Sequence, residues 1–335
     1  MRKIPTGIIG VGGYTALELV KILLSHPHFS LSYLGNSTGG VRADELYPAL
    51  NGVLDMEVGR SEIEEIAKRC ELVFLALPHK SAMEFAKKLL SKGLKVIDLS
   101  ADYRLELANY EAHYCPHSDR ENLSKAVYGL PEFQSKKIAQ ASLLANPGCY
   151  PTATLLALLP FVKYIKGSVF VDAKSGVSGA GKKLSENTHY GKINENMFAY
   201  SPLEHRHQIE IEEKVKLLGG RELQVNFIPH LCPFMRGMLV SVYTKVSEEI
   251  DESEILKKAY SHSPFVRVLS SPSEVKNVVG TNFCDIFAKR RGEDLFISSA
   301  IDNLLRGASS QAVCNANIMY SFPQDCGIPK VAYVP

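Results

Sequence analysis

The sequence lacks the features that mark several specialised classes of protein. It has no CxxC or HExxH pair and no run of lysine or arginine, and its net charge is only +2. We therefore expect no metal site and no nucleic-acid partner. It also has no apolar run of membrane-spanning length, and no secretory leader precedes the glycine turn that begins at Gly7. We expect no membrane association and a cytoplasmic location.

The cysteine content and the chain length indicate the cellular compartment and the number of domains. Seven cysteines, an odd number without a spaced framework, are typical of free thiols in a reducing compartment. At 335 residues the chain has room for two domains of ordinary size, at roughly 150 residues each. With 45% hydrophobic and 22% charged residues, it has the composition of an ordinary globular protein.

The first residues have the pattern of a nucleotide-binding unit. Residues 4–9 form an apolar strand, and residues 14–24 have the apolar spacing of a helix. Such a strand, glycine turn and helix offer backbone N–H groups and a positive dipole end to a pyrophosphate. The spacing Gly7-x-x-Gly10-x-x-Gly13 departs from the strict fingerprint, so a plain strand–helix turn is the alternative. The cofactor-binding candidates here are Gly10, Gly12, Gly13, Tyr14 and Thr15.

The adenosine end of the cofactor is predicted just beyond a second strand, residues 29–34. Residues 35–42 carry hydroxyls, glycines and an arginine, with no acidic side chain to bind a ribose 2′-hydroxyl. This composition favours a 2′-phosphate, so we expect NADP(H) rather than NAD. Ser37, Thr38 and Arg42 are the candidates near that phosphate; the alternative is a loop in which Ser37 and Thr38 cap their own backbone.

Strands and helices continue to alternate up to residue 100. The apolar runs 72–78 and 96–100 suit parallel strands that are buried on both faces, with a helix at 81–92 between them. This alternation predicts a Rossmann-like, doubly wound α/β domain. Ligands of such sheets bind at the carboxyl ends of the strands, which places Pro78 and residues 101–104 near the ligand.

The second half of the chain has a different pattern. Several of its strands alternate polar and apolar residues, which predicts an α+β domain with a largely antiparallel sheet. Small residues at 307–310 suit close packing, and a last helix near 308–320 is expected to return to the first domain. The predicted strands are 168–173, 222–229, 238–246 and 294–301, and the predicted helices are 152–164, 207–218 and 252–261.

Cys149 lies in the segment Asn-Pro-Gly-Cys-Tyr-Pro-Thr, residues 146–152. Pro147 and Gly148 force a tight turn before an apolar helix that runs from Thr152 onward. A thiol at a helix start meets unpaired N–H groups and the positive end of the helix dipole, which favour the thiolate. Free cysteines are commonly buried and inert. The surrounding motifs favour a catalytic nucleophile at Cys149 instead.

Two further stretches carry polar chemistry. If residues 204–210 are helical, His205 and His207 point to different faces and only one of them addresses the thiol. Glu210 shares a face with His207, which would give a thiol, an imidazole and a carboxylate, the general form of an activated nucleophile. A charged helix start is the plainer interpretation. The glycine-rich stretch 174–182 either supplies N–H groups to a ligand or is a mobile surface loop.

As a set, these segments resemble the N-acetyl-gamma-glutamyl-phosphate reductase family over nearly the whole chain. The similarity rests on Gly10-x-x-Gly13-Tyr14-Thr15-x-x-Glu18-Leu19, Leu77-Pro78-His79, His205-Arg206-His207 and the segments 98–104, 128–132, 146–152, 175–181, 229–237 and 302–304.

The resemblance implies an NADPH-dependent reductase of an acyl phosphate that acts in arginine biosynthesis. Cys149 matches the family nucleophile, and residues 205–207 match the segment that supplies the base, which we assign to His207. Attack by the thiolate releases phosphate and leaves a thioester, which hydride then reduces to N-acetylglutamate 5-semialdehyde. The substrate-binding candidates are Asn146, Arg104, His205, Arg206, Glu210, His230 and Arg236. Further cofactor-binding candidates are Ser178, Gly179 and Asn303.

The resemblance also implies a domain organisation. An NADP-binding domain (1–148) is followed by a catalytic and oligomerisation domain (149–303), and a C-terminal helix and tail (304–335) return to the first domain. We expect a homo-oligomer, a dimer or a tetramer, whose small-molecule partners are the acyl phosphate and phosphate.

Three other functions are compatible with parts of the sequence. A reductase of aspartyl phosphate or of a carrier-bound aminoadipyl phosphate would use the same chemistry. A cysteine hydrolase with a nucleotide domain would need no nicotinamide, and a redox sensor would oxidise Cys149. The glycine loop at 176–181 and the match at Asp302 and Asn303 argue against the hydrolase and the sensor, since neither needs a second loop facing a cofactor.

Overall fold

The computed structural model describes residues 2–333. The chain forms two compact units. The first consists of residues 2–147 together with 308–328, and the second of residues 148–307 together with 329–333. No helix within the described residues is long and apolar enough to cross a membrane.

The first unit is built on an eight-stranded sheet whose central strands are parallel. Strand β3 pairs antiparallel with β4, and every other neighbouring pair is parallel. In spatial order the strands are β3 (Val41–Arg42), β4 (Glu57–Arg60), β2 (Phe29–Asn36), β1 (Ile4–Ile9), β5 (Leu72–Leu75), β6 (Lys95–Asp98), β8 (Leu143–Ala145) and β7 (Val127–Tyr128).

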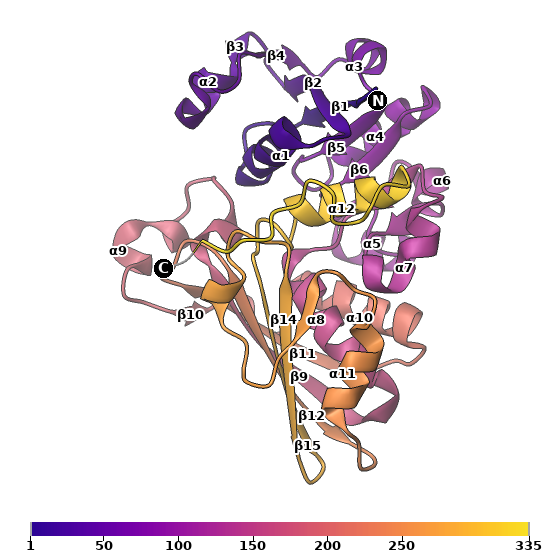
Figure 1. Ribbon diagram of the computed structural model, residues 1–335, viewed down its shortest axis with the longest axis vertical. Coiled ribbons are helices and arrows are strands. Elements are labelled where there is room, and N and C mark those ends of the chain that lie inside the picture. The colour runs from indigo at the N-terminus through magenta and orange to yellow at the C-terminus, as the bar shows by residue number, and fades with distance from the viewer. Residues whose placement is uncertain (1, 334–335) are drawn as a thin grey trace. The chain divides into compact units, whose positions relative to one another are not determined.

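Helices connect these strands, as the sequence predicts for a doubly wound domain. They are α1 (Tyr14–Ser25), α2 (Ala43–Leu46), α3 (Ile63–Arg69), α4 (Ala82–Ser91), α5 (Leu107–His113), α6 (Arg120–Leu123) and α7 (Pro131–Ile138). A last helix, α12 (Ser309–Met319), packs against α1 and α7 in the same unit and is coloured yellow in Figure 1. Within the sheet, β2 is the neighbour of β1 on one side and β5 is its neighbour on the other. The strand order therefore reverses direction at β1, which marks the topological switch point.

The second unit contains a seven-stranded mixed sheet. Only β11 with β9 and β13 with β14 pair parallel, so the predicted largely antiparallel sheet is confirmed. In spatial order the strands are β10 (Phe198–Ala199), β11 (Val225–Cys232), β9 (Ile165–Gly176), β12 (Met238–Val246), β15 (Asp294–Ile301), β14 (Cys284–Arg291) and β13 (Val266–Val268).

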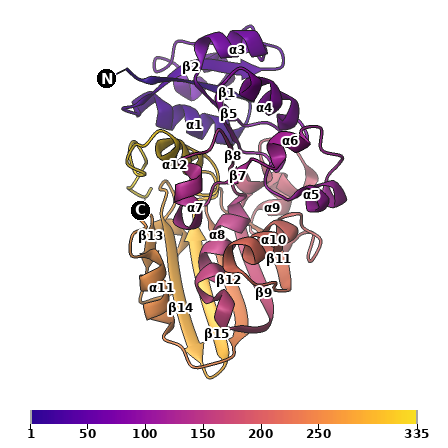
Figure 2. The same ribbon diagram turned by 90° about the vertical axis from the view of Figure 1, so that its right-hand side faces the viewer.

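Three helices cover one face of this sheet: α8 (Cys149–Leu158), α10 (His207–Gly219) and α11 (Glu252–Tyr260) (Figure 2). A fourth, α9 (Tyr190–Ile193), belongs to the long segment between β9 and β10. Alternate residues of the strands are exposed on the other face, and among them Phe170 is 53% exposed and its cross-strand neighbour Tyr243 is 48% exposed. The polar and apolar alternation of these strands therefore follows from a sheet that is covered by helices on one face only.

Some element boundaries differ from those predicted. Helix α8 begins at Cys149 rather than Thr152, and it ends at Leu158, where a 3₁₀ segment continues to Tyr164. Pro160 lies at the start of that segment and cannot donate an α-helical hydrogen bond, which accounts for the change. Strand β14 was not predicted, and the charged residues at its end (289–291) obscure its alternation.

Candidate active site

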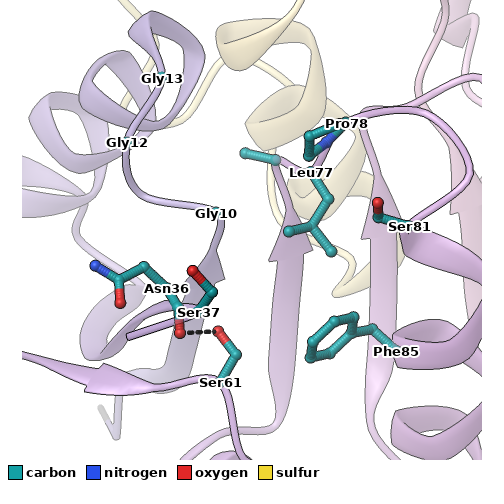
Figure 3. Close-up of a pocket in the computed structure, with 11 residues that line it drawn as sticks. Gly10, Gly12, Gly13, Asn36, Ser37, Ser61, Leu77, Pro78, Ser81 and Phe85 are labelled. Carbon is teal, nitrogen blue, oxygen red and sulfur yellow. Dashed lines mark hydrogen bonds between the residues drawn. The ribbon is translucent and has the colours of Figure 1, made fainter. Parts of the chain in front are cut away.

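A pocket of about 630 Å³ lies in the first unit, at the carboxyl ends of β1, β2 and β5 (Figure 3). This is the switch point of the sheet, where doubly wound folds bind their ligands. Gly10 follows β1, Asn36 ends β2, and Pro78 follows β5. The lining consists of Gly10, Gly12, Gly13, Asn36, Ser37, Ser61, Ala76, Leu77, Pro78, Ser81 and Phe85.

The glycines of this pocket fit a phosphate-binding turn. Gly10 has φ +93°, and a Cβ there would lie 2.4 Å from the carbonyl oxygen of Ala76, so no other residue fits. A Cβ on Gly12 or Gly13 would meet nothing within 4 Å, which leaves their backbone open to a ligand. The residues present therefore fit the diphosphate of a dinucleotide at the start of α1.

Not every predicted cofactor residue lines the pocket. Tyr14 and Thr15 lie in the first turn of α1, outside the lining. Thr38 donates from its backbone N–H to the Asn36 side chain at 2.9 Å. The Arg42 guanidinium is paired with Asp44 at 3.2 Å and with Asp55 at 2.9 Å. Of the predicted set, Gly10, Gly12, Gly13, Ser37 and Pro78 do line it.

Six residues of the lining were not predicted as cofactor-binding residues: Asn36, Ser61, Ala76, Leu77, Ser81 and Phe85. Tyr47, outside the lining, was not predicted either. The Tyr47 hydroxyl donates to the carbonyls of Val11 at 2.5 Å and Gly13 at 2.7 Å, which holds the glycine turn from below. Burial raises the pKa of Tyr47 to about 12, so the hydroxyl keeps its proton at neutral pH. Asn36 belongs to residues 35–42, where the ribose is expected, but no local sequence signal distinguishes Tyr47.

Cys149 is the first residue of α8 in the second unit and is partly exposed. The N-cap residue, Gly148, has an extended backbone, and its N–H donates to Glu210 Oε1 at 3.0 Å. A Cβ on Gly307 would lie only 2.6 Å from Cys149 Cβ, so the chain there passes closely over the cysteine. The thiol thus lies where the first-turn N–H groups and the helix dipole favour a negative charge.

His205, His207 and Tyr150 form an aromatic group beside this helix start. Helix α10 begins at His207, so His205 lies before the helix. The Tyr150 ring contacts both imidazoles edge-on, at centroid distances of 5.8 and 5.9 Å. The expectation that the two histidines point to different faces depended on a helix over residues 204–210, and this condition is not met, because His205 precedes α10.

Burial keeps His205 and the two phenols beside it uncharged. Burial, and next the Arg206 charge, lower the pKa of His205 to about 4, and Glu210 opposes the shift only in part. The Tyr200 hydroxyl donates to that of Tyr150 at 3.1 Å. Burial raises the pKa of Tyr200 to about 12 and raises that of Tyr150 further. Both phenols and His205 are uncharged at neutral pH. Nothing in the sequence singled out Tyr200.

Other candidates of the second unit lie beside carboxylates or bridge two segments of the chain. His230 Nδ1 lies 3.1 Å from Asp172, and Arg236 Nε donates to the buried Asp302 at 2.6 Å. Arg206, the N-cap residue of α10, is exposed. Asn303 joins the predicted glycine loop to Gly237, the residue before β12: its Nδ2 donates to Ser178 Oγ at 3.0 Å, and its Oδ1 accepts from Gly237 N at 2.7 Å.

Two substrate-binding candidates, Arg104 and Asn146, belong to the first unit and are buried. Arg104 Nε donates to the carbonyl oxygen of Asn146, and its Nη2 donates to that of Leu99, both at 2.8 Å. The Asn146 side chain in turn accepts from Asn315 Nδ2 at 3.2 Å. These bonds tie the ends of β6 and β8 together.

Comparisons with known proteins match both units. Residues 5–141 match the family described as the NAD binding domain of semialdehyde dehydrogenase, and residues 149–303 match its dimerisation domain. An N-acetyl-gamma-glutamyl-phosphate reductase of Wolinella succinogenes is 61% identical, and the match covers 100% of both chains. The reductase of the same name from Sulfurovum sp. is 54% identical over 99% of this chain and 100% of its own. The one from Aquifex aeolicus is 43% identical over 100% and 99%.

Solved structures of aspartate semialdehyde dehydrogenases share the fold. The Vibrio cholerae enzyme II, in complex with ASA, has a TM-score of 0.73 at 15% identity, over 96% of this chain and 99% of its own. The Candida albicans enzyme, with NADP, has a TM-score of 0.71 at 15% identity, over 95% and 98%. At 15% identity, this similarity shows that the fold is shared.

Proposed function

The chain belongs to the N-acetyl-gamma-glutamyl-phosphate reductase family of semialdehyde dehydrogenases. On this premise we propose that it reduces N-acetyl-gamma-glutamyl phosphate to N-acetylglutamate 5-semialdehyde and phosphate, using NADPH, in arginine biosynthesis. The comparisons confirm the predicted family and the oxidoreductase class, and the match to an NAD binding domain supports the predicted nicotinamide dinucleotide. They give no support to the hydrolase, the redox sensor or another acyl phosphate as substrate.

The observation that carries this proposal is the position of Cys149. A partly exposed thiol at the first residue of α8 is placed to be a thiolate, and a thiolate is the nucleophile for an acyl phosphate. Sγ attacks the carbonyl carbon, the C–O bond to phosphate breaks, and a thioester forms on Cys149. NADPH, when bound, supplies the hydride that reduces the acyl group.

His207 is proposed as the acid–base group. Its ring lies beside Tyr150, the residue that follows the nucleophile. His205 is the poorer base, because burial lowers its pKa to about 4. His207 would take the thiol proton and return a proton to the substrate oxygen. Glu210, which accepts a hydrogen bond from Gly148, is proposed to hold the turn that precedes Cys149.

The remaining assignments follow the charge of the ligands. We assign the phosphate and carboxylate of the substrate to cationic or amide donors, since anions need such partners. Those residues are Asn146, Arg104, His205, Arg206, His230 and Arg236. We assign the dinucleotide to the lining of the pocket in Figure 3, with Tyr14, Thr15, Thr38 and Arg42 at its margin and Ser178, Gly179 and Asn303 in the second unit.

The assembly is proposed to be a homodimer or a tetramer. Each chain is predicted to have two domains (1–148 and 149–303), with a tail (304–335) that joins the first; of that tail, residues 308–328 belong to the first unit and residues 304–307 and 329–333 to the second. Residues 149–303 match a dimerisation domain. Three aromatic side chains lie in register on the exposed face of the sheet, because Tyr243 is paired with Phe170 on one side and Phe296 on the other. Sedimentation of Tyr243→Lys as a smaller species than the wild type would support this interface, and an unchanged size would exclude it.

A cytoplasmic location is proposed from the seven free cysteines.

The proposed function is tested by the reverse reaction. Phosphate-dependent reduction of NADP should be fast with N-acetylglutamate semialdehyde and at least about 100-fold slower with aspartate semialdehyde, since the site must reject a shorter and differently charged substrate. Comparable rates, or a preference for aspartate semialdehyde, would overturn the substrate assignment.

Replacing the nucleophile provides a second test. Cys149→Ser should abolish turnover without loss of folding, because the hydroxyl has nearly the size of the thiol but is not ionised. Acyl transfer from substrate to the wild type, seen by mass spectrometry, should be absent from the variant. An active Cys149→Ser enzyme would exclude the thioester.

A further inference from the structure

The turn after β5 forms one wall of the dinucleotide pocket and has a strained backbone. Leu77, Pro78 and Ser81 line the pocket, and α4 begins at the next residue, Ala82 (Figure 3). Lys80, within the turn, has φ +74°, a conformation that residues other than glycine rarely adopt. Ser81 is the N-cap residue, yet its side chain makes no capping hydrogen bond. The turn and the helix start therefore have to be held by another part of the chain.

The carboxylate of Asp102 holds both. Its Oδ1 accepts a hydrogen bond from Lys80 N at 2.7 Å, and its Oδ2 accepts one from Ala82 N at 3.0 Å. These two bonds bracket Ser81, so the backbone is fixed on both sides of a pocket-lining residue. The carboxylate also lies at the N-terminus of α4, where the helix dipole favours a negative charge.

Asp102 is itself fixed by a buried network. The Tyr110 hydroxyl donates to Oδ1 at 2.9 Å, and both side chains are fully buried. The backbone N–H of Asp102 donates to Ser100 Oγ at 3.1 Å. A second bond links the same two loops, because the N–H of Ala101 donates to His79 Nδ1 at 2.9 Å. The carboxylate thus reaches the turn in a single orientation.

We propose that Asp102 is a positioning residue of the cofactor pocket. It does not belong to the lining, and it acts through the backbone of residues 80 and 82, which keeps Pro78 and Ser81 in place for a nicotinamide dinucleotide. This inference rests on the proposed function, which assigns NADP(H) to this pocket. Asparagine at position 102 would retain the shape but turn an amide NH₂ toward one of the two N–H donors.

The test compares Asp102→Asn with the wild type. The dissociation constant of NADPH, measured by fluorescence without substrate, should rise about tenfold, the range for losing one buried charge-assisted hydrogen bond. The KM for NADPH should rise with it, while kcat at saturating NADPH stays within about threefold, because only cofactor binding is affected.

Asp119→Asn is the matched control. Asp119 is also a buried carboxylate of the first unit, but it accepts from Tyr103 and Asn122 rather than from the turn. Its replacement should lower the melting temperature and leave the NADPH dissociation constant unchanged. A merely structural role of Asp102 would give the same result in both variants.

Two further variants test whether the loss of affinity arises from the turn after β5. Lys80→Gly in the Asp102→Asn background should restore much of the affinity, because glycine adopts the left-handed backbone without steric cost. Tyr110→Phe removes one donor to Asp102 and should raise the dissociation constant about threefold. This milder variant decides the question if Asp102→Asn does not fold.

The outcomes separate this inference from the proposed function. A wild-type protein that does not bind NADPH would contradict the proposed function itself. A wild type that binds NADPH, with unchanged affinity in both Asp102→Asn and Tyr110→Phe, would overturn the positioning role alone. Equal weakening in Asp119→Asn, or no recovery with Lys80→Gly, would also overturn it.

Discussion

His205 and His207 bring their imidazole rings together edge to face, with centroids 4.8 Å apart and planes at 66°. The backbone N–H of His207 donates to His205 Nδ1 at 3.1 Å, so that nitrogen carries no proton. Together with the low pKa of His205, this makes one imidazole a fixed, neutral support and leaves the other as the acid–base candidate.

The two histidines should therefore differ in kinetics. His207→Asn should lower kcat by about 100-fold or more, the range for losing a general acid–base, and its pH–rate profile should lose the limb due to that imidazole. His205→Asn should mainly raise KM and retain the limb, because the pKa of His205, about 4, lies below the working range. The reverse pattern would assign the base to His205.

Gly307 should tolerate no side chain. A Cβ there would lie 2.4 Å from the carbonyl oxygen of Asn303 and 2.6 Å from Cys149 Cβ. Gly307→Ala should therefore displace the nucleophile and lower kcat by about 100-fold, since small misplacements are costly in a reacting group. Gly191→Ala is the control, because its Cβ would meet nothing closer than 3.5 Å. Equal activity of both variants would contradict the packing described around Cys149.

The cofactor preference should depend on Ser37. This residue lines the pocket after β2, where the ribose is expected. Ser37→Asp should lower kcat/KM for NADPH about tenfold or more and affect NADH less, because a carboxylate repels the 2′-phosphate. Ser135→Asp, an equal change of charge at an exposed position of α7, should have no such effect. An NADH preference in the wild type would show that this loop is misinterpreted.

Asp98 should make stability depend on pH. It is fully buried, and burial, followed by the Asp102 charge, raises its pKa to about 7, well above its value of about 3.9 in an unfolded chain. The folded state therefore holds a proton that the unfolded state releases between these values. This stabilisation is complete below pH ~4 and is lost as the pH rises to ~7, at up to about 1.4 kcal/mol per pH unit.

Urea unfolding of the wild type and Asp98→Asn between pH ~4.5 and ~8 measures this contribution. The free energy of unfolding of the wild type should fall relative to that of the variant as the pH rises, and the difference should be constant above pH ~8. Parallel curves across the range would show that Asp98 is ionised in the folded protein.

The local elements could be predicted because their causes are local. The Gly10 turn, the parallel strands near 72–75 and 95–98, and the strands β12 and β15 follow from glycine spacing and hydrophobic periodicity, which depend on residues close in sequence. Cys149 could be singled out for the same reason, since Pro147, Gly148 and the apolar helix after it lie within ten residues.

Contacts between distant segments could not be predicted in this way. The Asp102 carboxylate meets the backbone of residues 80 and 82, Tyr47 supports Gly13, and Tyr200 donates to Tyr150, fifty positions earlier. Hydrophobic periodicity does not predict these contacts, because they depend on how the strands and loops pack in three dimensions. The histidine pair shows the same limit, since His205 precedes the helix that begins at His207 and the two imidazoles nevertheless lie side by side.

The sequence by itself determined the two-part α/β and α+β organisation, the nucleotide turn and the cysteine nucleophile candidate. Turns, helix starts and strand patterns depend on residues that are close together in the sequence. Only the tertiary structure decided which side chains surround the pocket and which histidine loses its charge through desolvation. Burial and desolvation arise when remote segments pack, and they set the pKa values and hydrogen-bond partners on which the chemistry depends.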